Sequence, residues 1–136
     1  MSRIIGIDFG LSKVGIAISD PLGVISMPLE VIRYKNQEDL IKSIKKITIE
    51  KRVEILVIGY PLNMNFKENE MTKIIDKFKT TMEKNGFTIY LEDERLSSEY
   101  AKKIMIQQDI KTGKNKEMVD ILAASIILQT YLDRKK

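Results

Sequence analysis

The sequence predicts an α/β fold: a five-stranded mixed sheet flanked by helices, with the element order βββαβαβαα. Two observations predict this. Residues 3–33 hold three apolar, β-branched runs separated only by turn signals, and the rest of the chain alternates segments of helical spacing with short apolar runs. Strands joined by tight turns pair antiparallel, whereas strands joined through helices are parallel, so the sheet is expected to contain both pairings.

The first three strands should form a meander. The apolar runs 3–9 and 14–19 are separated only by residues 10–13, which predicts a β-hairpin. Asp20-Pro21-Leu22-Gly23 is a turn signal, and residues 24–33 are apolar enough to add a third antiparallel strand.

The middle of the chain predicts two helices and two parallel strands. From Glu38, apolar residues recur at helical spacing, and the segment 53–59 has the composition of a strand buried on both faces. A second helical pattern stops at Asn85-Gly86, and residues 87–91 supply the fifth strand. The two helical patterns comprise Leu40, Ile41, Ile44 and Ile47, and then Met71, Ile74, Ile75, Phe78 and Met82.

Two helices are expected to close the chain. Ser97 can cap the first, and the second follows the polar segment 111–116. The apolar face predicted for the last helix comprises Met118, Ile121, Leu122, Ser125 and Leu128. Residues 134–136 are expected to fray. No repeat or flexible linker divides the sequence, so residues 1–136 are expected to form one domain.

Composition restricts the possible chemistry. The chain has no cysteine and no histidine, which excludes disulfides, thiolate nucleophiles, imidazole ligands and the Ser-His-Asp triad. Carboxylates, lysines, hydroxyls or the backbone must therefore carry any reaction. No apolar run approaches the roughly 18 residues of a membrane helix, so we expect a cytoplasmic protein without a membrane partner. The net charge of +4 mildly favours polyanionic partners.

Asp8 is the first candidate site residue. It lies at the end of the first strand between Gly6 and Gly10, where missing side chains let a ligand or another backbone come close. Asp8 is then either a metal ligand or a turn aspartate that accepts backbone hydrogen bonds.

The second candidate is the acidic segment after the fifth strand. Asp93 and Glu94 emerge at the carboxyl end of a parallel strand, the edge where open α/β sheets place their sites. Arg95 could hold a phosphate with two hydrogen bonds or pair with Asp93. The alternative is that the charged run from Glu92 to Arg95 is a solvated loop.

The third candidate is Asp120, early in the last helix. Ala123 and Ala124 follow it at i+3 and i+4, a small-residue face that lets the helix approach the sheet and deliver Asp120 to Asp8. Alternatively, Asp120 only complements the helix dipole. Lys116, in the preceding segment, either contacts backbone phosphates or keeps that segment hydrated.

Together these acids fit one chemistry. Carboxylate oxygens suit Mg²⁺ or Mn²⁺, and two such ions about 3.5 to 4 Å apart can promote phosphodiester cleavage. That reaction requires neither histidine nor cysteine. We therefore expect a nucleic-acid substrate, with Lys13, Arg95 and Lys116 as candidate phosphate-binding residues.

Several motifs in the right order resemble the bacterial YqgF/RuvX family over nearly the entire chain. They are Ile7-Asp8-Phe9-Gly10 with Gly15, Ser19-Asp20-Pro21, Gly59-Tyr60-Pro61-Leu62-Asn63-Met64, Asp93-Glu94-Arg95-Leu96-Ser97-Ser98, and residues 116–120 with Ala123-Ala124. The resemblance implies a ribonuclease-H-like fold, related to the Holliday junction resolvase RuvC, and nuclease processing of the 5′ end of precursor 16S rRNA, with pre-ribosomal particles as possible partners. It also implies that Asp8, Glu94 and Asp120 are the catalytic, metal-binding acids, and it favours Glu94 over Asp93.

The sequence departs from the family pattern in two places. Asn65-Phe66 and Asn69 stand where the family usually has Asp-Gly and a further glycine, and Ile121 stands where it usually has lysine. Neither departure removes an acidic ligand, but the first could change how the segment after the fourth strand contacts substrate.

Other functions compete with the RNA nuclease. A Holliday junction resolvase would use the same metals, but junction cutting requires two symmetric sites and thus a dimer. A noncatalytic nucleic-acid or ribosome-assembly binder is opposed by retention of all three acids. The first strand also resembles the phosphate-binding strands of actin-like and sugar-kinase ATPases, but those proteins close two lobes over ATP and this chain is long enough for only one.

Overall fold

The computed structural model describes residues 3–60, 70–93 and 116–135, and within them the chain forms a five-stranded sheet of order β3-β2-β1-β4-β5. The strands are β1 (Arg3–Phe9), β2 (Lys13–Ser19), β3 (Ser26–Arg33), β4 (Val53–Tyr60) and β5 (Thr88–Asp93). The helices are α1 (Gln37–Lys51), α2 (Glu70–Lys84) and α4 (Lys116–Arg134). The pairings of β2 with β1 and β3 are antiparallel and those of β4 with β1 and β5 are parallel, which confirms the predicted mixed sheet.

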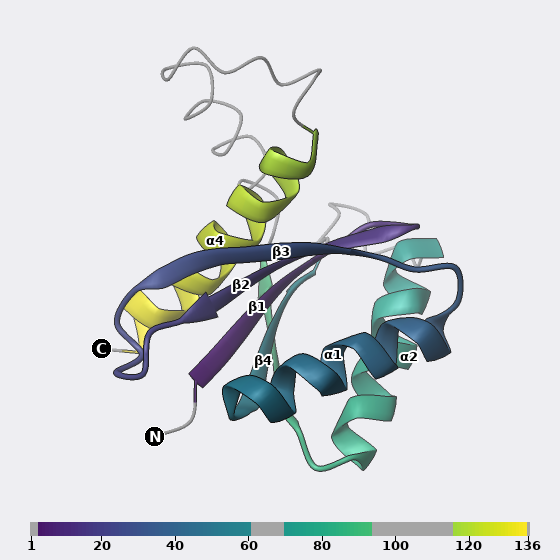
Figure 1. Ribbon diagram of the computed structural model, residues 1–136, viewed down its shortest axis with the longest axis horizontal. Helices are drawn as coiled ribbons and strands as arrows, with labels where there is room; N and C mark the ends of the chain where they lie inside the picture. Colours follow the sequence, from purple (N-terminus) through teal and green to yellow (C-terminus); the bar gives the residue numbers. More distant parts are fainter. Residues whose placement is uncertain (1–2, 61–69, 94–115, 136) are drawn as a thin grey trace.

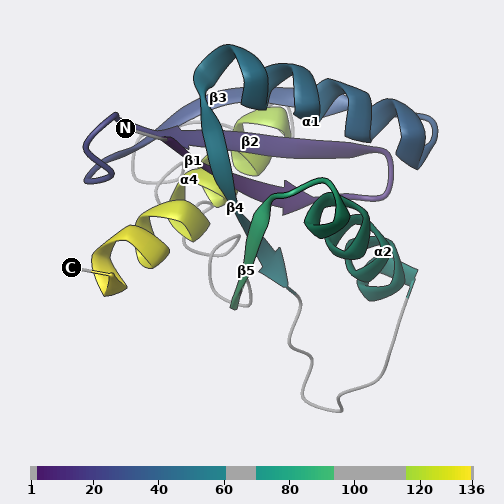
Figure 2. The ribbon, with the colours of Figure 1, turned by 90° about the horizontal axis from the view of Figure 1, so that it is seen from below.

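The helices cover both faces of the sheet. In Figures 1 and 2, α4 crosses one face and α1 and α2 lie on the other. The larger core lies on the α1 and α2 side, where Leu40, Ile44 and Phe78 are fully buried. Burying one such side chain contributes about 1.5–3 kcal/mol, so the buried faces of α1 and α2 hold these helices on the sheet. None of the described helices is long and apolar enough to cross a membrane.

The boundaries of α1 and α2 are set by local signals. The Asn36 side chain caps α1 by accepting a hydrogen bond of 2.9 Å from the Asp39 backbone N–H. Arg52 ends α1 in the left-handed conformation, with φ of 57°. After α2 the chain turns at Gly86, with φ of 93°, a conformation that glycine adopts at little cost. The predicted stop at Asn85-Gly86 is confirmed.

The turn between β2 and β3 is tied to itself and to α4. The Asp20 carboxylate accepts hydrogen bonds from the backbone N–H groups of Ile25 and Val24, at 2.9 and 2.7 Å, and these bonds lower the pKa of Asp20 below its usual value. The Gln129 side chain of α4 accepts from the Ser26 N–H at 2.9 Å and donates to the Val24 carbonyl at 3.0 Å. The hairpin therefore has a fixed position against α4.

Two expectations about the C-terminal part of the chain are wrong. Strand β5 continues through Asp93 instead of ending at Leu91, and α4 continues through Arg134, which was expected to fray. The two extended ends are joined, because Arg134 forms an ion pair with Glu92 on β5. Lys135 also lies over the Tyr131 ring, 5.3 Å from its centroid. The helix expected after Ser97 lies outside the described residues.

The predicted buried face of α4 is also partly wrong. Leu128 is fully buried as expected, but Ser125, Ile121 and Leu122 are only partly buried and Met118 is 42% exposed. The face that α4 buries comprises Ala123, Ala124, Ile127, Leu128, Tyr131 and Leu132. The alanines turn toward the sheet because small side chains there allow the closest approach of helix and sheet backbones.

Candidate active site

Asp8 lies near the carboxyl end of β1, on the sheet face that α4 covers. Gly6 shares this face with Asp8, because residues two apart on a strand point the same way. A Cβ atom at Gly6 would lie 2.7 Å from the Leu128 Cβ and 2.9 Å from the Ala124 carbonyl oxygen, both in α4. The half-buried Asp8 side chain therefore projects toward the side occupied by this helix.

Gly15 brings Asp120 to the same place. Gly15 is the direct partner of Asp8 in the β1–β2 ladder. A Cβ atom at Gly15 would lie 2.6 Å from the Asp120 carbonyl carbon and still closer to its oxygen, so only glycine admits the helix at this distance. The backbone of Asp120 thus packs against the residue opposite Asp8. The close approach of α4 to the sheet, which its small face predicts, is confirmed at this point.

The Asp120 carboxylate has one ion-pair partner among the described residues. Lys13 Nζ lies 3.1 Å from Asp120 Oδ2, and the two side chains are 24% and 28% exposed. Oδ2 is itself buried and accepts no hydrogen bond of good geometry within the described part of the chain. A carboxylate oxygen has more than one lone pair, so beside Lys13 this oxygen is suited to a further cation. This donor set fits Mg²⁺ or Mn²⁺, which prefer carboxylate oxygen.

The turn that carries Lys13 is held in place by Tyr34. The Gly10 backbone N–H donates to the Lys13 carbonyl at 2.8 Å. The Tyr34 hydroxyl donates to the Gly10 carbonyl at 2.6 Å, and the Tyr34 N–H donates to the Ser12 carbonyl at 3.0 Å. Burial raises the pKa of Tyr34, so the hydroxyl stays protonated as a donor. The sequence gives no signal for this contact, since 24 residues separate Tyr34 from Gly10.

Glu92 is a buried carboxylate on the same face of the sheet. Ile58 of β4 pairs with Ile7 of β1, so the next residue of β4, Gly59, lies beside Asp8. Gly59 also pairs with Glu92 of β5, so Glu92 lies in the row of Asp8 with Gly59 between them. The backbones of Asp8 and Glu92 are therefore two interstrand spacings apart, which amounts to about 10 Å. Both oxygens of Glu92 accept from the Arg134 guanidinium at 2.7 Å.

The Glu92 ion pair fixes the far end of α4. The Glu92 side chain is 5% exposed, whereas the Arg134 side chain is 63% exposed. Since Arg134 occupies both oxygens, Glu92 is a structural residue at the border of the site. The proposal that it belongs to a solvated loop is therefore wrong. The pair has no signal in the sequence because its members are 42 residues apart.

The remaining predicted site residues are described only in part. Glu94 and Arg95 lie outside the described residues. Lys116 begins α4, but its side chain is not among those described. Asp93 is the exposed last residue of β5. Within the described ranges no three acidic side chains converge as a metal site, and Asp8 with Asp120 is the described part of the predicted ligand set.

Comparison with known proteins decides the family. A family model described as "RuvX: Holliday junction resolvase" matches residues 2–134. The chain belongs to the RuvX family. The resemblance of its motifs to this family is thereby confirmed.

This RuvX-family chain has relatives of similar length. It is 38% identical over 132 residues to a Dictyoglomus thermophilum protein named "Putative pre-16S rRNA nuclease", with 96% of this chain and 95% of that protein covered. It is 40% identical over 132 residues to a Desulforamulus reducens protein of the same name, with 96% of each covered.

Solved structures confirm the ribonuclease-H-like fold of this RuvX-family chain. The T. thermophilus RuvC in complex with a Holliday junction substrate superposes with a TM-score of 0.62 at 15% identity, covering 99% of this chain and 96% of RuvC. The Fowlpox virus resolvase with its junction DNA superposes with a TM-score of 0.62 at 13% identity, covering 98% of each chain. These likenesses concern the fold alone.

Proposed function

We propose that this RuvX-family chain is a divalent-metal-dependent nuclease that processes the 5′ end of precursor 16S rRNA in the cytoplasm. The observation that carries the proposal is the approach of α4 to β2 at Gly15, which sets the Asp120 backbone against the partner of Asp8. The names of the relatives support RNA as the substrate.

The described residues suit phosphodiester hydrolysis. Asp8 and Asp120, with Glu94 as the third acid, would hold Mg²⁺ or Mn²⁺. A bound ion of this kind supplies activation of water and charge stabilisation at the leaving oxygen. Lys13, which lies 3.1 Å from Asp120 Oδ2, would orient that carboxylate and add positive charge where the phosphate enters. The bonds from Tyr34 hold the Lys13 turn rigid for this role.

Holliday junction cleavage is the second candidate. The description of the matching family favours it. The same acids would serve, but the chain would have to present two copies of the site as a dimer. A noncatalytic binder of nucleic acid or of ribosome-assembly particles is the third, and the juxtaposed acids of the site count against it.

Cleavage of two substrates separates these functions. Purified protein is incubated with Mg²⁺ or Mn²⁺ and either end-labelled 16S precursor leader RNA or a synthetic four-way DNA junction. Asp8→Asn tests the site, and Glu50→Gln, an exposed acid on α1, controls for charge. We expect metal-dependent cutting of the leader that Asp8→Asn abolishes and Glu50→Gln preserves.

The other outcomes are equally informative. Symmetric nicking of the junction alone would support the resolvase. Cutting that is independent of metal or unaffected by Asp8→Asn would contradict the carboxylate site. No cutting of either nucleic acid, repeated with precursor ribosomal particles as substrate, would favour the binding module.

A further inference from the structure

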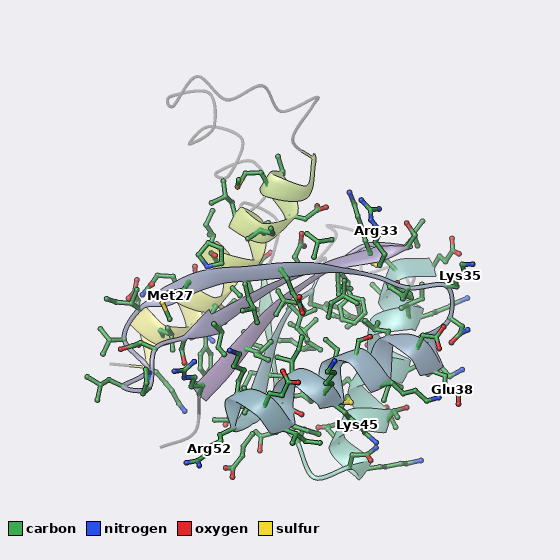
Figure 3. The ribbon with its side chains drawn as sticks, viewed as in Figure 1. Met27, Arg33, Lys35, Glu38, Lys45 and Arg52 are labelled. Atoms are coloured by element: carbon green, nitrogen blue, oxygen red, sulfur yellow. The ribbon has the colours of Figure 1, made fainter. Side chains whose placement is uncertain are left out.

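Arg33, the last residue of β3, shares the face and the row of Lys13. The two residues are direct partners in the β2–β3 ladder. Directly opposed residues on antiparallel strands point to the same face of the sheet. Because the Lys13 side chain reaches Asp120 on α4, Arg33 must also project from the α4 face. Figure 3 shows Arg33 on this side of the sheet.

The end of β3 has a fixed position relative to the acids. Tyr34, the next residue, is bonded through its backbone to Ser12 and through its hydroxyl to Gly10. Arg33 is exposed, and β3 is separated from the strand of Asp8 by β2 alone. Two interstrand spacings place the backbones of β3 and β1 about 10 Å apart, a distance that a few nucleotides span.

We propose that Arg33 binds a backbone phosphate of the RNA strand, a few nucleotides from the bond that is cut. The proposal rests on the nuclease function proposed above. Arg33 is exposed beside Lys13 on the same row, so it extends the positive charge of the site outward from Asp120. A planar guanidinium can hold a phosphate with two parallel hydrogen bonds, which suits a site that positions a strand without reading its sequence.

The direction of Lys35 distinguishes it from Arg33. Lys35 is also exposed and lies two residues later, but in Figure 3 it points outward beyond the end of the sheet, away from α4. Proximity along the chain is therefore not enough to place a cation beside the acids. The register of β3 places Arg33 on the face of the acids, and the RNA strand is expected to cross β3 and β2 on its way to Asp8.

The salt dependence of binding tests this role. Fluorescence anisotropy measures the affinity for labelled single-stranded leader RNA between about 50 and 200 mM KCl. All proteins carry Asp8→Asn so that the RNA stays intact. Arg33→Gln is compared with Lys46→Gln, which removes an exposed cation from α1 on the opposite face, and with Arg33→Lys, which keeps the charge.

We expect Arg33→Gln to weaken binding about fivefold and to reduce the slope of log K against log salt by about 0.7, the value for one phosphate contact with a single strand. Lys46→Gln should change neither quantity. Arg33→Lys should keep the slope and lose part of the affinity, because lysine cannot make the paired hydrogen bonds.

Equal slopes for Arg33→Gln and Lys46→Gln would overturn the role of Arg33. If the protein with native Arg33 still cut the leader, the proposed nuclease function would stand despite that result. Failure of the Asp8→Asn protein to bind the RNA at all would overturn the phosphate contact, and failure of the unsubstituted protein to cut it would count separately against the nuclease.

Discussion

Gly15→Ala tests whether the close approach of α4 to β2 creates the site. The added Cβ would lie 2.6 Å from the Asp120 carbonyl carbon and still closer to its oxygen, where ordinary contact begins at 3.4 Å, so the helix backbone must recede by about 1 Å. Overpacking of this kind costs about 1–3 kcal/mol. For a chain of this length, each kcal/mol lost from the free energy of unfolding lowers Tm by about 3–6 °C.

The same movement would displace Asp120 from Asp8. A misplacement of about 1 Å in a catalytic constellation can reduce the rate about a hundredfold. We therefore expect Gly15→Ala to remain folded at 25 °C and to lose about two orders of magnitude in leader cleavage. The assay pairs circular-dichroism melting with single-turnover cleavage well below Tm.

Gly23→Ala is the matched control. Gly23 has φ of 70° and no heavy atom within 4 Å of the position of an added Cβ, so alanine there is strained without touching α4. The strain costs roughly 1–2 kcal/mol, which is comparable to the loss expected for Gly15→Ala. Gly23→Ala should therefore melt earlier and still cut at the normal rate. Normal cleavage by Gly15→Ala, at a normal Tm, would refute the reasoning.

Two further predictions concern stability. Arg134→Met leaves the Glu92 carboxylate buried without its partner. Because Arg134 itself is largely exposed, we expect the free energy of unfolding to fall by about 2 kcal/mol in thermal melts, and Glu92→Gln should recover part of this loss in the double variant. An unchanged Tm would show that the pair is dispensable. Asp20 has a folded-state pKa below the usual 3.8, so its stabilising effect is present above that pH and is lost as the pH falls through the lowered pKa. Asp20→Asn should thus destabilise the protein more at pH 7 than at pH 2 in urea titrations, and an equal effect at both pH values would contradict this linkage.

Local patterns explain what the sequence could predict. The meander, α1 and α2 follow from apolar spacing and from caps such as Asn36 and Gly86, which act within a few residues. The close packing of α4 on the sheet at Asp120 was predictable from the small face of this helix. Gly15 completes that signal, since it stands opposite Asp8 in the hairpin.

Long-range pairing explains what the sequence could not predict. The run from Glu92 to Arg95 has the composition of a loop, but Arg134 neutralises Glu92 and allows the strand to continue. The face of α4 was misassigned because apolar spacing favours large side chains, whereas the close approach of α4 to Gly6 and Gly15 favours the small residues Ala123 and Ala124 on its buried face. The bonds from Tyr34 to the hairpin have no local signature either.

The binding of Mn²⁺, followed by electron paramagnetic resonance, tests the central claim most directly. The unsubstituted protein is titrated beside Asp8→Asn, Asp120→Asn and the control Glu50→Gln. If Asp8 and Asp120 share a metal, each of their variants should bind Mn²⁺ at least about tenfold more weakly, whereas Glu50→Gln should match the unsubstituted protein. Equal affinity in all four proteins would contradict a metal site built from these two carboxylates.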